Sequence, residues 1–238
     1  MKIDNVKAIV FDTFGTISDW RSSIAAEGAR IAAQKGIADF DSDAFARAWR
    51  AGYRPGMARV ISGERGWTPV DVIHRERLDE IIPDFGLDML NEDERVHLNE
   101  AWHRINPWVD SIPGLLRLKK NHLIAPLSNG SLVLLSSMAK RAGIPWDFVF
   151  SSDMHQAYKR DPKVYQNAIA LLGYEPHQVM MGAAHNDDLE AARAEGMRTA
   201  YINRPTEYGV DQSKDFEATS DWDIIADSVE GVADAMEC

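Results

Sequence analysis

Short apolar runs alternate with helix-forming segments through the second half of this chain, and no other feature constrains the fold as strongly. In chain order, these runs and the helical patterns between them are residues 122–127, 132–142, 148–150, 162–172, 179–182, 188–194 and 199–202. One more buried run, residues 6–10, stands near the N-terminus. Strands that are connected through helices lie parallel to one another. The sequence therefore predicts an α/β fold whose core is a doubly wound parallel sheet of the Rossmann-like type.

A long helical segment, residues 18–105, separates the first strand from the others. Residues typical of helix starts recur along it, at Asp19, Asp41, Thr68 and Asn91. The Pro-Gly pair at 55–56 is expected to interrupt the second helix, and the segment contains no strand-like run. We therefore expect a core domain made of residues 1–17 and 106–238, with a helical cap domain, residues 18–105, inserted into it.

The composition restricts the partners that the protein can have. The 238 residues include 26 basic and 37 acidic ones, for a formal net charge of −11, and no basic block occurs. This argues against nucleic acid and anionic membranes, whereas a small anionic substrate fits a cleft with local positive groups. Without a signal-peptide pattern or an apolar run of membrane-spanning length, a cytoplasmic location is expected. The single cysteine, Cys238, excludes an intrachain disulfide and a cysteine-based zinc site.

Polar residues follow several of the predicted strands. Asp12 comes directly after the first run, a Ser-Asn-Gly sequence at 128–130 follows the second, and Lys159 and Asp188 follow later ones. Each alone fits a turn, a helix cap or a solvated loop. Because parallel strands bring their carboxyl ends to one edge of the sheet, where α/β proteins bind ligands, these groups are expected to share one crevice.

With these residues the chain resembles the haloacid dehalogenase superfamily and, within it, the L-2-haloacid dehalogenases. The superfamily has a nucleophilic aspartate, a Ser or Thr, a lysine and a terminal acid, matched by Asp12, Ser128, Lys159 and Asp188. The dehalogenase signatures match residues 12–16, 128–130 and 158–165 and the cap pair Trp49 and Arg50. The resemblance covers essentially the whole chain. It implies hydrolysis of short 2-haloalkanoic acids to 2-hydroxyacids and halide, without cofactor or metal, by a homodimer.

The resemblance also implies a role for each matched residue. Asp12 would attack the 2-carbon, expel halide and form an ester that water hydrolyses. Lys159 would pair with Asp12, and Asp188 would hold Lys159. The other expected catalytic residues are Thr16, His185 and Tyr165, the last through a hydroxyl bonded to Asp12 or Lys159. The residues expected to bind substrate or halide are Thr13, Phe14, Trp49, Arg50, Tyr53, Ser128, Asn129 and Asn186.

Four positions depart from the pattern of the dehalogenases. Phe14 replaces a tyrosine, and Arg160 replaces the proline after the lysine. Ala183 and His185 stand where that branch often has serine and asparagine. His185 therefore has two interpretations. It either positions water or contacts halide, or it is a loop histidine that caps the following helix.

Two other functions remain open. A magnesium-dependent phosphatase of the same superfamily would carry acids near positions 14 and 184, where this chain has Phe14 and Ala184. The Phe14 carbonyl, Asp187 and Asp188 could still bind the metal. However, a carboxylate attacking phosphate meets a repulsion of about 4 kcal/mol per charge pair at ~4 Å and an effective ε of ~20. The missing acid therefore favours carbon chemistry over a phosphatase. The second alternative is a non-catalytic binding protein, and the presence together of the charged and polar site residues argues against it, namely Asp12, Arg50, Ser128, Lys159 and Asp188.

Overall fold

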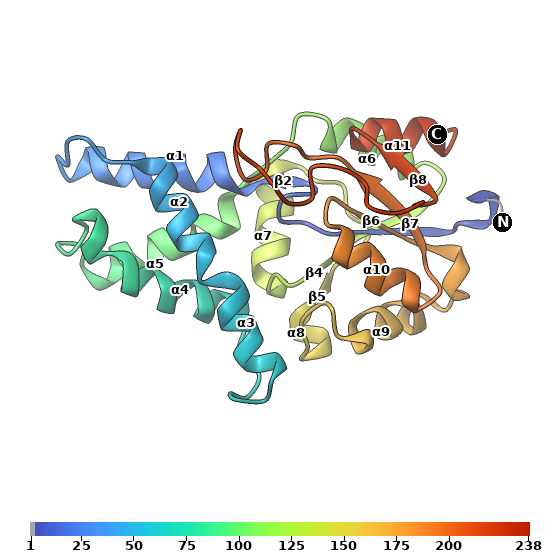
Figure 1. Ribbon diagram of the computed structural model, residues 1–238, viewed down its shortest axis with the longest axis horizontal. Helices are drawn as coiled ribbons and strands as arrows, with labels where there is room; N and C mark the ends of the chain where they lie inside the picture. Colours follow the sequence, from blue (N-terminus) through green and yellow to red (C-terminus); the bar gives the residue numbers. More distant parts are fainter. Residues whose placement is uncertain (1–2) are drawn as a thin grey trace.

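A parallel sheet of six strands forms the core of one half of the molecule (Figure 1). The computed structural model describes residues 3–238. The strands are β1 (Ala8–Phe11), β4 (Leu123–Ser128), β5 (Phe150–Ser151), β6 (Val179–Ala183), β7 (Arg198–Ile202) and β8 (Ile224–Ala226). Their order across the sheet is β5-β4-β1-β6-β7-β8, and all neighbours run parallel. The expected α/β fold with a doubly wound parallel sheet is confirmed.

Strand β1 lies near the middle of this sheet. Its four residues pair with residues 123–126 of β4 on one side and with 179–182 of β6 on the other. All four are buried because helices cover both faces, which is why the strand reads as one apolar run. Ile9 and Phe11 pack into one hydrophobic cluster and Val10 into the other. The residue that follows, Asp12, therefore starts from a firmly held backbone.

Helices flank both faces of the sheet (Figure 1). Those that pack on the Ile9 and Phe11 face are α6 (Ser111–Leu118), α7 (Leu132–Ala142) and α11 (Val229–Ala235). Those on the Val10 face are α9 (Pro162–Leu172) and α10 (Asn186–Ala194), and a short helix, α8 (Ser152–His155), follows β5. The sequence patterns identified α7, α9 and most of α10, but not α6, α8, β8 or α11.

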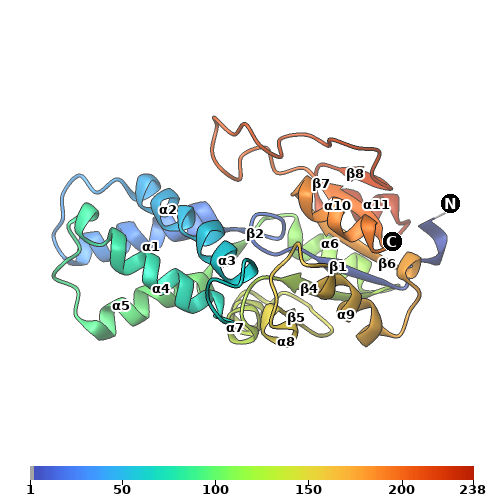
Figure 2. The same ribbon diagram turned by 60° about the horizontal axis from the view of Figure 1, so that its bottom comes forward.

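Five further helices form a group beside the sheet (Figures 1 and 2). They are α1 (Trp20–Gln34), α2 (Ser42–Ala51), α3 (Tyr53–Ile61), α4 (Val70–Ile81) and α5 (Glu92–Asn99). Where the chain enters and leaves this group, β2 (Ser18–Asp19) pairs antiparallel with β3 (Asn106–Pro107). The segment 18–105 is thus helical as expected, except that it begins with a two-residue strand.

Two expectations about helix boundaries in this group are wrong. The Pro-Gly pair at 55–56 does not interrupt a helix, because it lies in the first turn of α3, where a missing N–H costs no helical hydrogen bond. The break falls at Gly52 instead. Thr68 does not cap α4. Its hydroxyl donates to the carbonyl of Gly66, and Pro69 holds the capping position.

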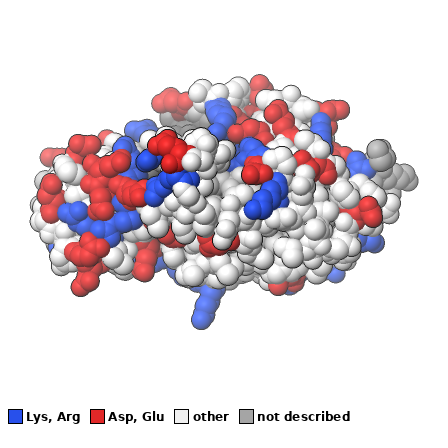
Figure 3. Space-filling model, turned by 90° about the horizontal axis from the view of Figure 1, so that it is seen from below, with Lys and Arg blue, Asp and Glu red and all other residues white. Residues whose placement is uncertain are grey.

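The surface agrees with the charge pattern of the sequence. On the face drawn in Figure 3, basic side chains are mixed with acidic ones over the helical group at the left and do not gather into one basic surface. In the part of the chain that the structure describes, no helix has the length and apolar character needed to cross a membrane.

A buried ion pair connects the loop after β7 to segments that are distant from it in the sequence. Arg204 donates two hydrogen bonds of 2.8 Å to the carboxylate of Asp110, which stands before α6, and a third to the carbonyl of Thr16. Asp110 also accepts from the backbone N–H of Val229 at the start of α11. Four segments far apart in sequence therefore meet at one pair.

We expect Arg204→Leu to lower the free energy of unfolding by about 3–5 kcal/mol, because it leaves the Asp110 carboxylate buried without its cation. Urea unfolding followed by circular dichroism measures the loss. The matched control is Glu64→Gln, which breaks the exposed pair with Arg59 and should change the stability by less than about 0.5 kcal/mol. Equal losses in the two variants would contradict a structural role for the buried pair.

Candidate active site

A cavity of about 600 Å³ opens beyond the carboxyl ends of the central strands, between the sheet and the helical group. Asp12, Lys159 and His185 line it from the sheet side, and Arg50 and Tyr53 line it from α2 and α3. The strand topology explains this convergence, because β1, β4 and β6 are neighbours and their following loops meet at one edge. Of the polar groups expected to share one crevice, Asp12, Asn129 and Lys159 line it, whereas Asp188 is bonded to Lys159 outside the lining and Ser128 does not line it.

Asp12 makes three side-chain contacts at the floor of this cavity. Its Oδ1 accepts a hydrogen bond of 2.8 Å from Lys159. Its Oδ2 accepts one of 2.8 Å from the hydroxyl of Thr16 and lies 3.1 Å from Nδ1 of His185. Thr16 is itself fixed, because its hydroxyl accepts from the backbone N–H of Ala184. The carboxylate is thereby held in one orientation with little freedom to rotate.

The Lys159 ammonium is completely bonded within the protein. Besides Asp12, it donates to Asp188 at 2.6 Å and to the carbonyl of Leu127 at 2.9 Å. Burial lowers the pKa of Lys159, but the charges of Asp12 and Asp188 outweigh that effect and raise it. Burial likewise raises the pKa of Asp12, but Lys159 and His185 together hold it well below its ordinary value. Asp12 is therefore an anion at neutral pH, as a nucleophile must be.

Arg50 brings a partly buried cation to the opposite wall. Its guanidinium lies 3.9 Å from the ring centre of Tyr53, 5.2 Å from that of Trp20 and 5.6 Å from that of Phe14. These distances are typical of cation–π contacts. Its Nη1 has no hydrogen-bond partner within residues 3–238. A buried N–H group without a partner is costly, so this atom is available to an anion that enters the cavity.

The aromatic wall keeps this side of the cavity free of competing charge. Phe14 meets Tyr53 edge to face, and His74 stacks on both Tyr53 and Trp102. Burial lowers the pKa of His74 to about 3, so this ring is neutral and does not repel Arg50. Arg50 is thus the one charged side chain in this layer of rings.

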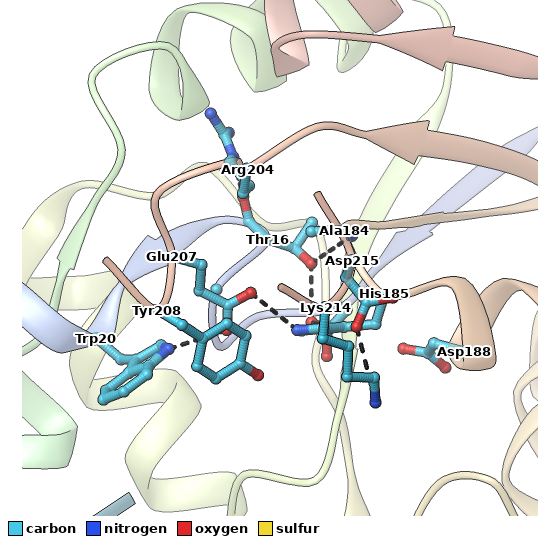
Figure 4. Close-up of polar contacts among 12 residues, drawn as sticks. Thr16, Trp20, Ala184, His185, Asp188, Arg204, Glu207, Tyr208, Lys214 and Asp215 are labelled. Carbon is cyan, nitrogen blue, oxygen red and sulfur yellow. Dashed lines mark hydrogen bonds and ion pairs between the residues drawn. The ribbon is translucent and has the colours of Figure 1, made fainter. Parts of the chain in front are cut away.

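Glu207 was not expected from the sequence. It lies in the loop after β7, is 1% exposed, and accepts hydrogen bonds from Trp20 at 2.9 Å and from Nε2 of His185 at 3.0 Å (Figure 4). Gly15 lies against its carboxylate with φ +91°, and a Cβ at that position would overlap it. A glycine is therefore required at position 15, because the backbone there has a positive φ and because a side chain would overlap Glu207. No sequence signal marks Glu207, since neither a strand nor a helix pattern surrounds it.

One of the two interpretations of His185, a side chain that caps the following helix, is wrong, and its contact with water or halide stays a prediction. His185 stands just before α10 but makes no side-chain capping bond, and instead it bridges Asp12 and Glu207. Burial lowers the pKa of His185, but the charge of Glu207 and the bonds to both carboxylates outweigh it and raise that pKa well above the ordinary value. The ring is an imidazolium in contact with the candidate nucleophile.

Three expected contacts are wrong. The Tyr165 hydroxyl bonds neither Asp12 nor Lys159, because it donates to Asp188 at 2.6 Å. Asn186 does not line the cavity, since its amide bonds Asp215, Trp222 and the backbone at 217 and 219. Trp49 is no wall residue, because it is fully buried and its indole N–H donates to the carbonyl of His74.

The remaining expected residues are placed as follows. Phe14, Tyr53 and Asn129 line the cavity, and Asn129 also accepts from the backbone N–H of Lys159. Ser128 does not contact Asp12, since its hydroxyl oxygen accepts from the N–H of Gly130. Thr13 is fully buried behind the cavity wall.

The acids near Asp12 are already paired with cations. Lys159 lies between Asp12 and Asp188, and Arg160 donates to Asp187 at 2.5 Å and lies 3.4 Å from Asp188. Within the described residues no group of three or more His, Cys, Asp or Glu side chains is arranged to hold a metal ion. This donor set does not fit a hard divalent cation, which needs several unpaired oxygens. The peptide bond between Lys159 and Arg160 is cis.

Comparisons with known proteins agree with this geometry. The structure is similar to that of the defluorinating L-2-haloacid dehalogenase Rha0230, with a TM-score of 0.95 and 45% identity over 98% of this chain and 96% of that one. It is also similar to the L-2-haloacid dehalogenase PA0810, with a TM-score of 0.93 and 40% identity over 98% and 99% of the two chains. The (S)-2-haloacid dehalogenase 4A of Burkholderia cepacia is 28% identical over 87% of this chain and 88% of its own length.

A family model agrees with these relatives. The model of the haloacid dehalogenase-like hydrolases matches residues 6–196, which include β1, the whole helical group and α10. The matched residues carry Asp12, Lys159 and Asp188, the three charged groups that the structure joins. The chain belongs to the family of haloacid dehalogenase-like hydrolases.

Proposed function

We propose that this protein hydrolyses short L-2-haloalkanoic acids to 2-hydroxyacids and halide, through an ester on Asp12 and without a metal ion. The observation that carries the proposal is one cavity with an ionised carboxylate on one side and a buried arginine atom without a partner on the other. A monoanionic substrate with a leaving halide needs both groups. The likeness to two L-2-haloacid dehalogenases at 40% identity or more supports the same reaction.

The first step joins Asp12 to the substrate. A carboxylate oxygen of Asp12 attacks the 2-carbon in line with the carbon–halogen bond, whose electron pair leaves with the halide. Thr16 and Lys159 hold the nucleophile for this attack, and correctly oriented reactants reach effective molarities of roughly 10⁵–10⁸ M. The cation of Arg50 stabilises the halide as its charge develops. Phe14 and Tyr53 exclude water from the carbon centre.

The second step hydrolyses the ester. Water attacks Cγ of Asp12, the bond from Cγ to the ester oxygen breaks, and the 2-hydroxyacid leaves. Asp12 then regains its charge and its contacts with Lys159 and His185. The water oxygen remains on Asp12 and reaches product only in the next turnover.

The magnesium-dependent phosphatase is the weaker proposal. A phosphate dianion beside Asp12 would meet about twice the repulsion of a monoanion, roughly 8 kcal/mol at ~4 Å and ε of ~20. The acids that a metal would need to offset this are bound to Lys159 and Arg160. This donor set favours a monoanion, and the cations at the cavity mouth, Arg54 and Arg160, are paired with Asp187.

The wider organisation is also proposed. Residues 1–17 and 106–238 would form the core domain and 18–105 the cap domain, a division supported by the short β2–β3 pair at the crossing. A homodimer and a cytoplasmic location rest on the resemblance and on the composition. Sedimentation velocity would measure the oligomeric state.

Halide release tests the reaction. We expect the protein to release chloride from L-2-chloropropionate but not from the D enantiomer, with a rate that EDTA does not change, because no step uses a metal. Asp12→Asn should abolish release, and the exposed Asp221→Asn should leave it intact. An activity that EDTA removes and magnesium restores would overturn the metal-free mechanism.

Isotope labelling tests the intermediate. In a single turnover in ¹⁸O water, the label should enter the carboxylate of Asp12, because water attacks Cγ and not the substrate. Mass spectrometry of the peptide that contains Asp12 measures it. Label found only in the 2-hydroxyacid would mean that water attacks the 2-carbon directly.

Substitution of Arg50 tests the halide site. Arg50→Leu should lower the rate of halide release by roughly 10²–10³, since it removes a desolvated cation aimed at a developing charge. The loss should be larger for chloride than for bromide, which leaves more easily. Arg47→Gln, one turn earlier on α2 and paired with Asp43 at the surface, is the matched control. A loss that is equal for all halides would place Arg50 in carboxylate binding instead.

A further inference from the structure

A continuous chain of hydrogen bonds runs from Trp20 through Glu207 to His185 (Figure 4). From Nδ1 of His185 it continues to the candidate nucleophile, Asp12. All four side chains are buried. The two oxygens of Glu207 have different partners, because one accepts from Trp20 and the other faces Nε2 of His185. Glu207 therefore fixes the orientation of the imidazole and leaves Nδ1 directed at Asp12.

The acidic side chains described near Asp12, other than Glu207, are not placed to accept a proton from an attacking water. Asp188 is fully buried, and its oxygens contact Lys159, Tyr165 and Arg160. Asp187 is paired with Arg160 at the cavity mouth. By contrast, Nδ1 of His185 lies 3.1 Å from Oδ2 of Asp12. A water that attacks the adjoining Cγ therefore comes within hydrogen-bonding reach of this nitrogen.

We infer that His185 is the general base for hydrolysis of the Asp12 ester, that Glu207 is the residue that positions it, and that loss of the Asp12 charge switches the base on. This inference rests on the proposed function, because the ester forms only if Asp12 attacks a haloacid. Histidine is the side chain used most often as such a base. Glu207 thereby receives a role, although no sequence pattern marks this residue.

The change in the basicity of His185 follows from the two carboxylates that face its ring. In the resting protein both Asp12 and Glu207 stabilise the imidazolium, and the pKa of His185 is raised well above its ordinary value in spite of burial. Alkylation turns Asp12 into a neutral ester, so His185 keeps only Glu207 as a counter-charge. Its pKa then falls, because burial now opposes a single carboxylate.

The proton balance closes over one turnover. After halide leaves, Nδ1 of His185 releases its proton to water in the cavity, while Nε2–H still donates to Glu207. A water then attacks Cγ and gives a proton to Nδ1, and the departing alkoxide takes that proton as the Cγ–O bond breaks. Asp12 leaves this step as a carboxylic acid and returns its proton to Nδ1. One halide and one proton are released in all, as the hydrolysis requires.

The groups around His185 define what can influence its titration. Asp12 and Glu207 are in contact with it, Lys159 and Thr16 bond Asp12, and Tyr208 stands beside Glu207. Arg50 acts on both carboxylates from α2. The remaining charged groups are those of the cavity mouth, namely Arg54, Arg160, Asp187 and Lys214.

The variant Glu207→Gln should slow hydrolysis of the ester while leaving its formation nearly unchanged. With L-2-chloropropionate we expect a burst of about one halide per site at nearly the normal rate, followed by ester hydrolysis slowed roughly 10- to 100-fold, since a weakened base affects only the second step. The ester should accumulate on Asp12 and be visible by intact-protein mass spectrometry. His185→Asn, which leaves the bond from Trp20 to Glu207 in place, should accumulate ester as well. Glu190→Gln, an exposed change on α10, should show neither effect.

A double variant tests whether Glu207 acts through His185. In the His185→Asn background, Glu207→Gln should cause no further loss of ester hydrolysis, whereas independent effects would multiply. The pH dependence gives a second readout that a structural role would not move. The rate of ester hydrolysis should rise with pH along one ionisation in the natural protein, at lower pH in Glu207→Gln, and not at all in His185→Asn.

The outcomes distinguish this inference from the proposed function. If the natural protein and Glu190→Gln release no halide from any 2-haloacid, the proposed function is wrong. If both turn over but Glu207→Gln and His185→Asn accumulate no ester, or if they slow halide release and hydrolysis equally, the inference is wrong and the dehalogenase function stands. If Glu207→Gln does not fold, ester accumulation and the lost pH dependence in His185→Asn still decide whether His185 is the base.

Discussion

The site depends on one buried ammonium group, that of Lys159. It bridges Asp12 and Asp188, and without it two carboxylates would be buried within reach of each other, an arrangement that raises the pKa of one of them. With it, Asp12 stays ionised although it is buried. Lys159 can reach both acids because β1, β4 and β6 are adjacent in the sheet.

The first strand provides the rigidity that this bridge requires. β1 has a paired neighbour on each side and helices on both faces, so the position of Asp12 is set by the most constrained part of the fold. The turn after it is equally constrained. Gly15 adopts a positive φ with Glu207 packed against it, and Thr16 bonds both Asp12 and Ala184. A short motif therefore encodes a backbone path, the candidate nucleophile and the space for a distant carboxylate.

The sequence predicts best what local forces decide. Apolar runs locate β1 and β4, and helix α9 begins at Pro162 and ends at Gly173 as its terminal residues indicate. What it misses depends on contacts distant along the chain. Glu207 bonds a tryptophan 187 positions away, and nothing local marks that meeting. Asn186 lies in the expected loop, but the segment at 215–222 offers its amide better partners than the cavity does.

The charges gathered around the cavity explain why its substrate should carry a single negative charge. Three buried acids, Asp12, Asp188 and Glu207, face two buried cations, Lys159 and His185, and the partly buried Arg50. Lys159 and His185 contact the acids, whereas Arg50 lies among aromatic rings with one N–H group unpartnered. In the proposed first step the negative charge of Asp12 passes to the halide, which Arg50 can receive, while the ester removes one of the two charges that hold His185 protonated. Among the described residues the other cations, Arg54, Arg160 and Lys214, lie at the cavity mouth and share Asp187, so the cation beside Asp12 that is free for a substrate is Arg50, which favours a haloacid over a phosphate dianion.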